Sequence, residues 1–263
     1  MFRDTRRSRE YFEELLPEFE EGIEGTQQGL DDGDFALPDE RVDAAQQLYE
    51  LAILRCIAHY SNGASREQLA PLVAAILPLR RQLKTEADGL PVNQQVYRKP
   101  FEQFGEQGTA CGSPNLNRYV YALWWLSLLV ATGLDQNHRE EALALIDNEG
   151  KDALLDTLSQ YLKRSDGPVS GQLLYPELYQ PLLDCFRSTP DARPGLIRNF
   201  LDGWYDQLKE ADWYENHRCE LECVYTEYYV GYWSLEAVLV VNLLDIDDAL
   251  FRDHMYYPAA LRI

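Results

Sequence analysis

Apolar residues recur every three or four positions along most of this chain, and that spacing limits the possible folds more than any other feature. In residues 194–208, for example, Leu196, Ile197, Phe200, Leu201 and Trp204 fall on one side of a helix. No segment alternates apolar and polar residues convincingly, as a half-buried strand would. The sequence therefore predicts an all-α protein of about ten helices.

The length of 263 residues is enough for a substantial core, in one large domain or two small ones. Ser165-Asp166-Gly167-Pro168 is the best boundary by composition, so we expect helical halves over residues 1–166 and 167–263. A weak sequence similarity between residues 119–135 and residues 229–245 suggests that the halves are loosely related. We expect them to pack as one compact body.

Breaks between helices are predicted mainly from proline, glycine and capping residues. Pro17 should kink the first helix or start a second one, and residues 22–38 read as a loop. Ser65 should cap a helix that bends at Pro71 or Pro78. Further helices are expected over 6–24, 38–60, 65–83, 92–104, 119–132, 140–147, 151–163, 174–186 and 194–208.

The C-terminal stretch 212–258 combines aromatic residues, acids and a long apolar run. Its spacing from Tyr225 to Leu239 predicts one helical face, in which Gly231 would let another backbone approach closely. Glu236 stands inside the apolar run. We expect a buried carboxylate held by Arg or Tyr hydroxyl groups, because an unpaired buried charge is too costly.

The net charge of −20 is concentrated in two stretches. Residues 10–40 contain 12 acids and no Lys or Arg, and residues 202–248 contain 12 acids against Lys209 and Arg218. The two stretches carry −12 and −10, which leaves +2 for the rest of the chain. Solvated helix faces would explain this, and so would a surface that attracts a basic partner. Both interpretations disfavour binding to nucleic acid or to anionic membranes.

Cysteine usage and the N-terminal sequence indicate a reducing compartment. The five cysteines are scattered and suggest neither a disulfide framework nor a metal site. The first residues lack the apolar core of a signal peptide, and the longest uncharged run, 119–134, is shorter than a membrane helix. We therefore expect a soluble cytoplasmic protein without metal or cofactor.

The motifs of the second half resemble those of the PoNi family, immunity proteins that neutralise PoNe nuclease effectors delivered between competing bacteria, as in type VI secretion. The likeness covers roughly residues 172–258, and Arg3-Asp4 and Tyr11-Phe12 extend it more loosely to the N-terminal half. The segments that carry it are Leu173-Leu174-Tyr175-Pro176, Leu178-Tyr179, Phe200-Leu201, Trp204-Tyr205, Trp213-Tyr214, His217, Tyr229, Gly231-Tyr232-Trp233-Ser234, Glu236-Ala237, Ile246-Asp247-Asp248 and Tyr257-Pro258.

The resemblance and the charge together predict an immunity protein, not an enzyme, that covers the basic DNA-binding or catalytic face of a nuclease toxin. The expected contacts are Asp212, Glu215, Glu220, Glu222 and Glu227, with Tyr225 and Tyr228 as anchors, and a second set of Glu13, Glu14, Glu20 and Glu21. The residues expected to act as structural motif are Trp213, Tyr214, His217, Gly231, Tyr232, Trp233, Glu236, Asp247 and Asp248.

Two other interpretations stay open. One is a metal-dependent all-helical enzyme that uses Asp245, Asp247 and Asp248, although the plain interpretation of Asp247 or Asp248 is the cap of a new helix. The other is a helical adaptor with no toxin partner.

Overall fold

The computed structural model describes residues 1–102, 115–163, 166–218 and 228–263. Within these ranges the regular structure is helical and contains no strand, which confirms the predicted all-α class. None of the helices in these ranges is both long enough and apolar enough to cross a lipid bilayer.

Contacts divide the chain into two compact units. Unit 1 comprises Met1–Gln103 and Glu215–Gly231, and unit 2 comprises Phe104–Tyr214 and Tyr232–Ile263. The second half of the chain thus contributes a segment to the first unit. The boundary expected at residues 166/167 stays a prediction about sequence organisation, and the contact-defined units do not follow it.

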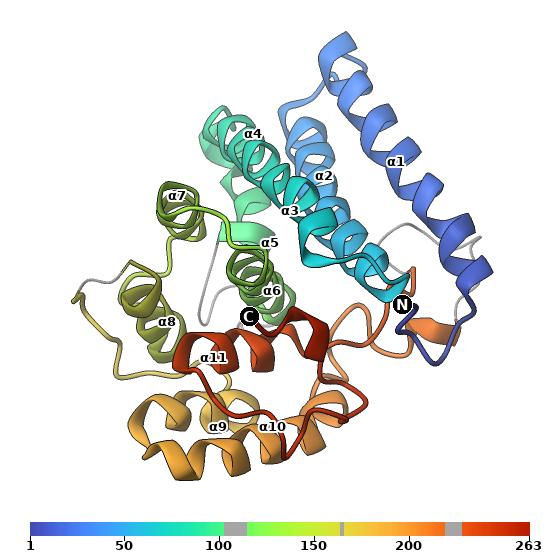
Figure 1. Cartoon of the computed structure of the whole chain (residues 1–263). Helices are drawn as coiled ribbons and strands as arrows, with labels where there is room; N and C mark the ends of the chain where they lie inside the picture. Colours follow the sequence, from blue (N-terminus) through green and yellow to red (C-terminus); the bar gives the residue numbers. More distant parts are fainter. Residues whose placement is uncertain (103–114, 164–165, 219–227) are drawn as a thin grey trace. The chain divides into compact units, whose positions relative to one another are not determined.

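Unit 1 is a helical layer built on α2. Helices α1 and α4 both pack against α2, and Figure 1 shows α1 running alongside it. Phe12, Leu15 and Phe19 form the buried face of α1. The described elements of this unit are α1 (Arg9–Asp32), α2 (Pro38–Ser61), α3 (Arg66–Ala74), α4 (Ile76–Asp88), η1 (Val92–Arg98), α5 (Lys99–Glu102) and η3 (Asn216–Arg218).

Helix α1 is longer than the sequence suggested. It runs through Pro17 without a break and ends at Gly33, whose φ of 80° terminates it in the left-handed conformation. The expected loop from residue 22 is wrong because Gly22, Gly29 and Leu30 still face the core. Gly29 is needed there, since a Cβ would stand 3.0 Å from the Phe35 ring.

The helix capped by Ser65 ends earlier than expected. Ser65 and Gln68 form the predicted capping box. The break falls at Ala75, between α3 and α4, and not at a proline. Pro78 lies in the first turn of α4, where its missing N–H has no helical partner to lose.

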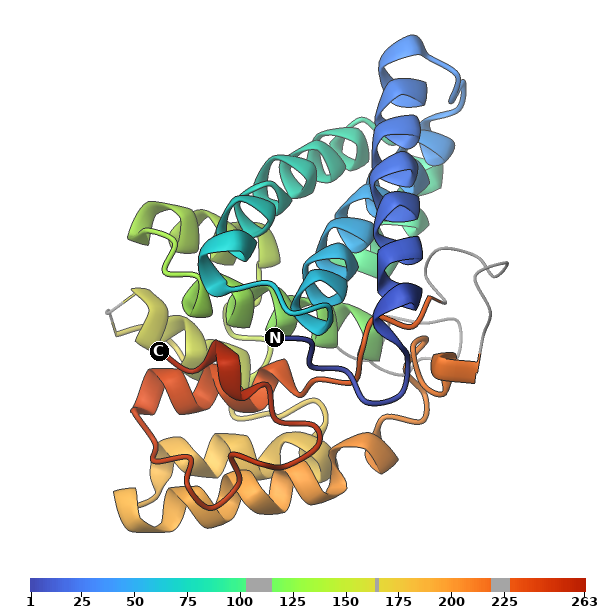
Figure 2. The ribbon, with the colours of Figure 1, turned by 45° about the vertical axis from the view of Figure 1, so that its right-hand side comes forward.

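Unit 2 is centred on α6 and α11, which pack against each other, while α9 and α10 form a neighbouring pair (Figure 2). The buried Ser127 hydroxyl of α6 donates a 2.7 Å hydrogen bond to the Leu235 carbonyl at the start of α11. Helices α6 and α11, which lie in the two similar segments 119–135 and 229–245, therefore pack against each other. The elements are α6 (Leu116–Ala131), α7 (Gln136–Ile146), α8 (Ala153–Lys163), α9 (Pro176–Arg187), η2 (Pro190–Ala192), α10 (Arg193–Gln207), α11 (Leu235–Leu244) and η5 (Ala259–Leu261).

The helix predicted from Tyr225 to Leu239 is wrong over its described first part. Residues 228–234 form no helix, and α11 begins only at Leu235. Gly231 has a φ of 108°, which a helix cannot contain. Aromatic spacing alone could not distinguish this non-helical segment from a helical face.

The acidic turn after α11 also differs from expectation. Asp245 ends the helix with a φ of 48°, as a C-terminus there requires. The Asp247 carboxylate accepts a 3.1 Å hydrogen bond from the Ala249 N–H, but turns follow in place of a new helix. Asp247 therefore closes a turn, and the expectation of a helix cap is wrong.

Candidate interaction surface

The outer side of α1 carries a continuous row of carboxylates. At 3.6 residues per turn these acids fall within an arc of about 100°, opposite the buried Phe12–Leu15–Phe19 side. The row extends about 33 Å along the helix at 1.5 Å per residue. We call it the α1 acidic face; it consists of Glu10, Glu13, Glu14, Glu21, Glu24, Asp31 and Asp32, all exposed.

The carboxylates of the α1 acidic face are not neutralised by ion pairs in the part of the chain that the structure describes. None of these carboxylates forms a salt bridge with a residue in the described ranges. Glu20, which we grouped with Glu13, Glu14 and Glu21, differs because it pairs with Arg55 of α2 at 2.8 Å. Three of the four predicted contacts on α1 are thus displayed to solvent, and the fourth is engaged within unit 1.

The second acidic stretch is neutralised only in part: four of its nine described acids pair with nearby cations. Glu215 pairs with Arg218 at 2.9 Å, Asp248 with Arg252 at 3.0 Å, and Asp245 with Arg262. Asp202 likewise pairs with Arg198 at 3.0 Å. Of the predicted contacts here, Asp212 is exposed and Glu215 half-buried, while Glu220, Glu222, Tyr225 and Glu227 lie outside the described residues.

Tyr228, predicted as an anchor for a partner, lies in the interior. It is 5% exposed, and its ring packs edge-on against Phe19 of α1 at 6.1 Å between centroids. Contact with a partner stays a prediction, and it would require the ring to leave this packing.

Within the segment 215–231 of unit 1, the structure describes residues 215–218 and 228–231, and we call these two parts the strap. Hydrogen bonds hold the strap to the N-terminal segment before α1, to α1 and to α2. Near the first end, Arg7 donates to the His217 carbonyl at 2.6 Å. Near the second, the Tyr229 hydroxyl donates to Asp4 at 2.6 Å and the Tyr11 hydroxyl donates to the Tyr229 carbonyl at 3.0 Å. The buried Ser61 hydroxyl donates to the Val230 carbonyl.

Both crossings between the units coincide with unusual backbone conformations. Glu215, the first residue of the strap, has a φ of 60°, and Gly231, the last, has a φ of 108°. A residue other than glycine bears a cost of about 1–2 kcal/mol in the left-handed region. The surrounding structure, and not local preference, therefore holds Glu215 in this conformation.

The remaining motif residues gather in an aromatic cluster inside unit 2. Trp213 stacks on Trp204 at 5.3 Å and lies 5.6 Å from Trp124 and 5.8 Å from Tyr232, measured between ring centroids. Tyr205 joins this group through Tyr214 at 4.7 Å and Tyr232 at 4.8 Å. Trp233 is half-buried beside it in sequence. The motif thus builds the core of unit 2.

Glu236 lies beneath this cluster without a basic partner in the described residues. Its carboxylate accepts from the Tyr179 hydroxyl at 3.3 Å and, weakly, from the Ser234 hydroxyl at 3.5 Å. Burial raises the pKa of Glu236 to about 7, although its own backbone N–H and the indoles of Trp204 and Trp124 oppose the shift. The indole nitrogens make no hydrogen bond of normal geometry. The predicted tyrosine partner is confirmed, but no arginine takes part.

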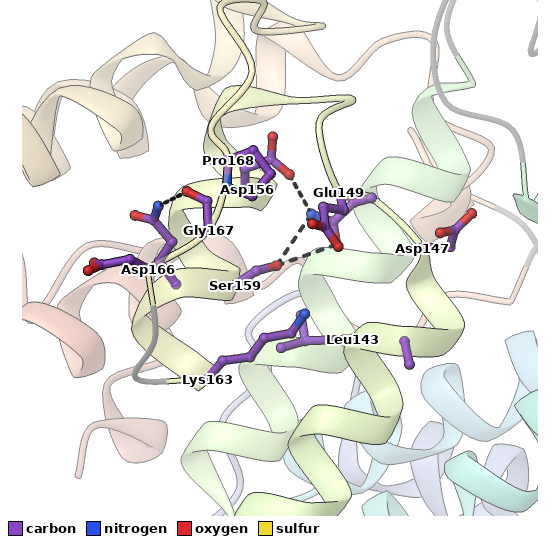
Figure 3. A pocket seen from close by; sticks show the side chains of 12 residues that line it. Leu143, Asp147, Glu149, Asp156, Ser159, Lys163, Asp166, Gly167 and Pro168 are labelled. Atoms are coloured by element: carbon purple, nitrogen blue, oxygen red, sulfur yellow. Dashed lines mark hydrogen bonds between the residues drawn. The ribbon is translucent and has the colours of Figure 1, made fainter.

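A group of polar side chains outside these features lines a cavity of about 380 Å³ between α7 and α8 (Figure 3). Asp156 is saturated there, because it accepts from Asn148, from the Gly150 N–H and from the Ser170 N–H. Nowhere in the described ranges do three His, Cys, Asp or Glu side chains converge in a way that could hold a metal ion. Asp245, Asp247 and Asp248, the acids of the enzyme alternative, bind different partners.

Comparison with known proteins assigns the C-terminal part of the chain. Residues 150–261 match the family model described as PoNe immunity proteins (PoNi), C-terminal. This part of the chain is thus similar to the C-terminal region of the PoNi immunity proteins. The PoNi match includes the strap, Glu236 and the aromatic cluster except Trp124, so it extends into both contact-defined units. The family is one of immunity proteins against PoNe nuclease effectors.

The fold is found in a solved structure as well. The crystal structure of protein PA2201 from Pseudomonas aeruginosa is 18% identical to this chain with a TM-score of 0.67, covering 99% of this chain and 90% of that one. At this identity the likeness establishes the fold alone. A search of curated proteins gave no match.

The residues that hold the strap in place were not predicted from the sequence. Asp4 is 7% exposed and also accepts from the Arg6 and Arg7 N–H groups. Ser61 is buried at the end of α2. The Arg3-Asp4 and Tyr11-Phe12 resemblance was the signal available for Asp4, whereas nothing in the sequence pointed to Ser61.

Proposed function

We propose that this protein is a cytoplasmic immunity protein that binds a cognate PoNe-type nuclease through the α1 acidic face and covers the basic surface with which the nuclease holds DNA. The observation that carries the proposal is the row of exposed carboxylates on α1 that no cation in the described residues neutralises. The similarity of residues 150–261 to the PoNi family supplies the class of partner.

The dimensions of α1 suit imitation of a nucleic acid. A nuclease must present Lys and Arg side chains to phosphates, and a protein with the same charge distribution competes for them. The face is about 33 Å long, close to one turn of duplex DNA. Such a field raises the association rate and orients the partner, while its benefit falls as salt increases.

The proposal narrows the predicted contacts. Glu13, Glu14 and Glu21 are assigned to the interface, together with Glu24 on the same side of α1. Glu20 is assigned to the Arg55 ion pair. Asp212 is exposed in unit 2 and remains a secondary candidate.

The test is charge reversal with a matched control. Replacing Glu13, Glu14, Glu21 and Glu24 with Lys should lower the association rate with the toxin encoded beside this gene at least tenfold at low salt and flatten its salt dependence. The control replaces Glu177, Asp206, Glu210 and Asp253, which are exposed acids of unit 2, with Lys and changes the net charge equally. Stopped-flow binding measures both variants.

The outcomes of this experiment distinguish the mechanism of charge imitation through α1 from the role of the protein in immunity. Equal losses in the two variants would mean that net charge alone matters and would reject α1 as the contact. Full affinity in the α1 variant would reject charge imitation but leave immunity standing. Failure of the unmodified protein to bind or protect against the adjacent toxin would favour the helical adaptor.

A further inference from the structure

The 3-10 helix η1 exposes its apolar residues to solvent, whereas an ordinary surface helix buries them. None of its residues is buried, although it contains Val92, Val96 and Tyr97. Val92 is 93% exposed and Val96 is 56% exposed. Large apolar groups on a surface element are unremarkable singly, but a cluster of them marks interaction sites.

Polar contacts hold η1 in position. The Gln95 side chain donates to the Leu90 carbonyl at 2.8 Å, and Arg98 donates to the Ala87 carbonyl at 3.0 Å and to Glu102 at 2.7 Å. The element is therefore anchored by its polar side chains while its valines face solvent. An ordered apolar surface of this kind loses little conformational entropy when a partner covers it.

A third apolar residue joins the valines from another element. Gln94, between Val92 and Val96, donates to the Asp39 carboxylate at 3.2 Å. That bond places η1 beside the start of α2, where Leu37 is 53% exposed. We call Leu37, Val92 and Val96 the unit 1 apolar patch.

The surroundings of the patch are negative. Asp31, Asp32, Asp34 and Glu40 are exposed in and around the turn that joins α1 to α2. Two neighbouring cations are already engaged, since Arg41 pairs with Glu86 at 2.6 Å and Arg98 with Glu102. An apolar centre with a charged border is the usual anatomy of a protein interface.

We propose that the unit 1 apolar patch is the second docking point for the cognate nuclease, and that it takes an apolar group set among Lys or Arg side chains on the toxin. The inference rests on the proposed function. Leu37 follows Asp32, the last carboxylate of the α1 acidic face, by five residues, so a basic partner that covers the turn between α1 and α2 would contact both. Desolvated apolar contacts slow dissociation, whereas the exposed acids mainly speed association.

The experiment compares two sets of exposed apolar residues. The test variant carries Leu37→Ser, Val92→Ser and Val96→Ser; the control carries Leu250→Ser and Met255→Ser, both 57% exposed in unit 2. Calorimetric titration with catalytically inactivated toxin should give about a 100-fold weaker Kd for the test variant, mostly through a faster dissociation rate, and an unchanged Kd for the control. Circular dichroism should show that both variants fold.

Several results would overturn this assignment. An unchanged Kd in the test variant rejects the patch while leaving the proposed function intact. An equal loss in the control rejects it as well. If the test variant alters only the oligomeric state of the free protein, the patch belongs to a second copy of this chain. If the unmodified protein does not bind the toxin, both proposals fail together.

Discussion

The hydroxyl group of Tyr229 donates a 2.6 Å hydrogen bond to the carboxylate of Asp4, across 225 positions of the sequence. The other Asp4 oxygen accepts from the backbone N–H groups of Arg6 and Arg7. A side chain from the second half of the chain therefore completes the N-terminal turn that precedes α1. Unit 1 cannot reach this arrangement until the strap has been synthesised and docked.

Removing this hydroxyl should weaken unit 1. The variant Tyr229→Phe keeps the buried ring but leaves one carboxylate oxygen of Asp4 without its donor, which should cost about 2 kcal/mol of unfolding free energy. Urea denaturation measures the loss. Tyr161→Phe, at an exposed tyrosine, should change stability by less than about 0.5 kcal/mol. A Tyr229→Phe protein as stable as the unmodified one would contradict the role given to this bond.

Two glycine substitutions should have opposite effects. Gly231→Ala places a Cβ at a φ of 108° and should destabilise the protein by at least about 1 kcal/mol. Gly25→Ala lies inside α1 with nothing within 4 Å of the new Cβ, so it should stabilise by about 0.5–1 kcal/mol. Thermal unfolding of both variants tests the pair, and a stabilising Gly231→Ala would show that the crossing tolerates other conformations.

The helices were predictable because their signals are local. The capping box of Ser65 and Gln68 and the apolar spacing around Trp204 depend on residues a few positions apart. The strap was not predictable for the opposite reason: the backbone groups of Tyr229 and Val230 bond to side chains 218 and 169 positions away. Aromatic spacing therefore pointed to a helix that these distant partners replace.

The distribution of charge was likewise predictable from the sequence only in part. Counting acids located both negative stretches, but a count does not show which carboxylates are paired. Arg55 neutralises Glu20 from 35 positions away, and Arg262 neutralises Asp245 from 17 positions away. The α1 acidic face stays negative because its side of the helix turns away from α2. Only the tertiary structure shows which carboxylates are exposed without a partner and which are paired with an arginine.

Two cysteine thiols should be unreactive in the native protein. Burial raises the pKa of both Cys56 and Cys185 to about 12, so roughly one thiol in ten thousand is ionised at pH 8. Iodoacetamide should therefore label both only after unfolding, as peptide mass spectrometry would show. Labelling of either thiol at the rate of free cysteine would mean that its part of the core opens readily.

Glu236 should make the stability of unit 2 depend on pH. Its pKa is about 7 when folded and 4.5 as the ordinary value, so the folded state binds more protons than the unfolded state between these limits. Stability must then fall as pH rises from about 4.5 through 7. The shift corresponds to a loss on the order of 3 kcal/mol, because the carboxylate ionises without a cation beside it.

Glu236→Gln isolates this effect. Glutamine keeps an acceptor for the Tyr179 hydroxyl but cannot ionise, so the variant should match the unmodified protein near pH 4 and exceed its unfolding free energy by a growing margin up to pH 8. Urea denaturation at a series of pH values measures the difference. A constant difference across that range would show that the carboxylate keeps one protonation state, and the desolvation argument for Glu236 would then be wrong.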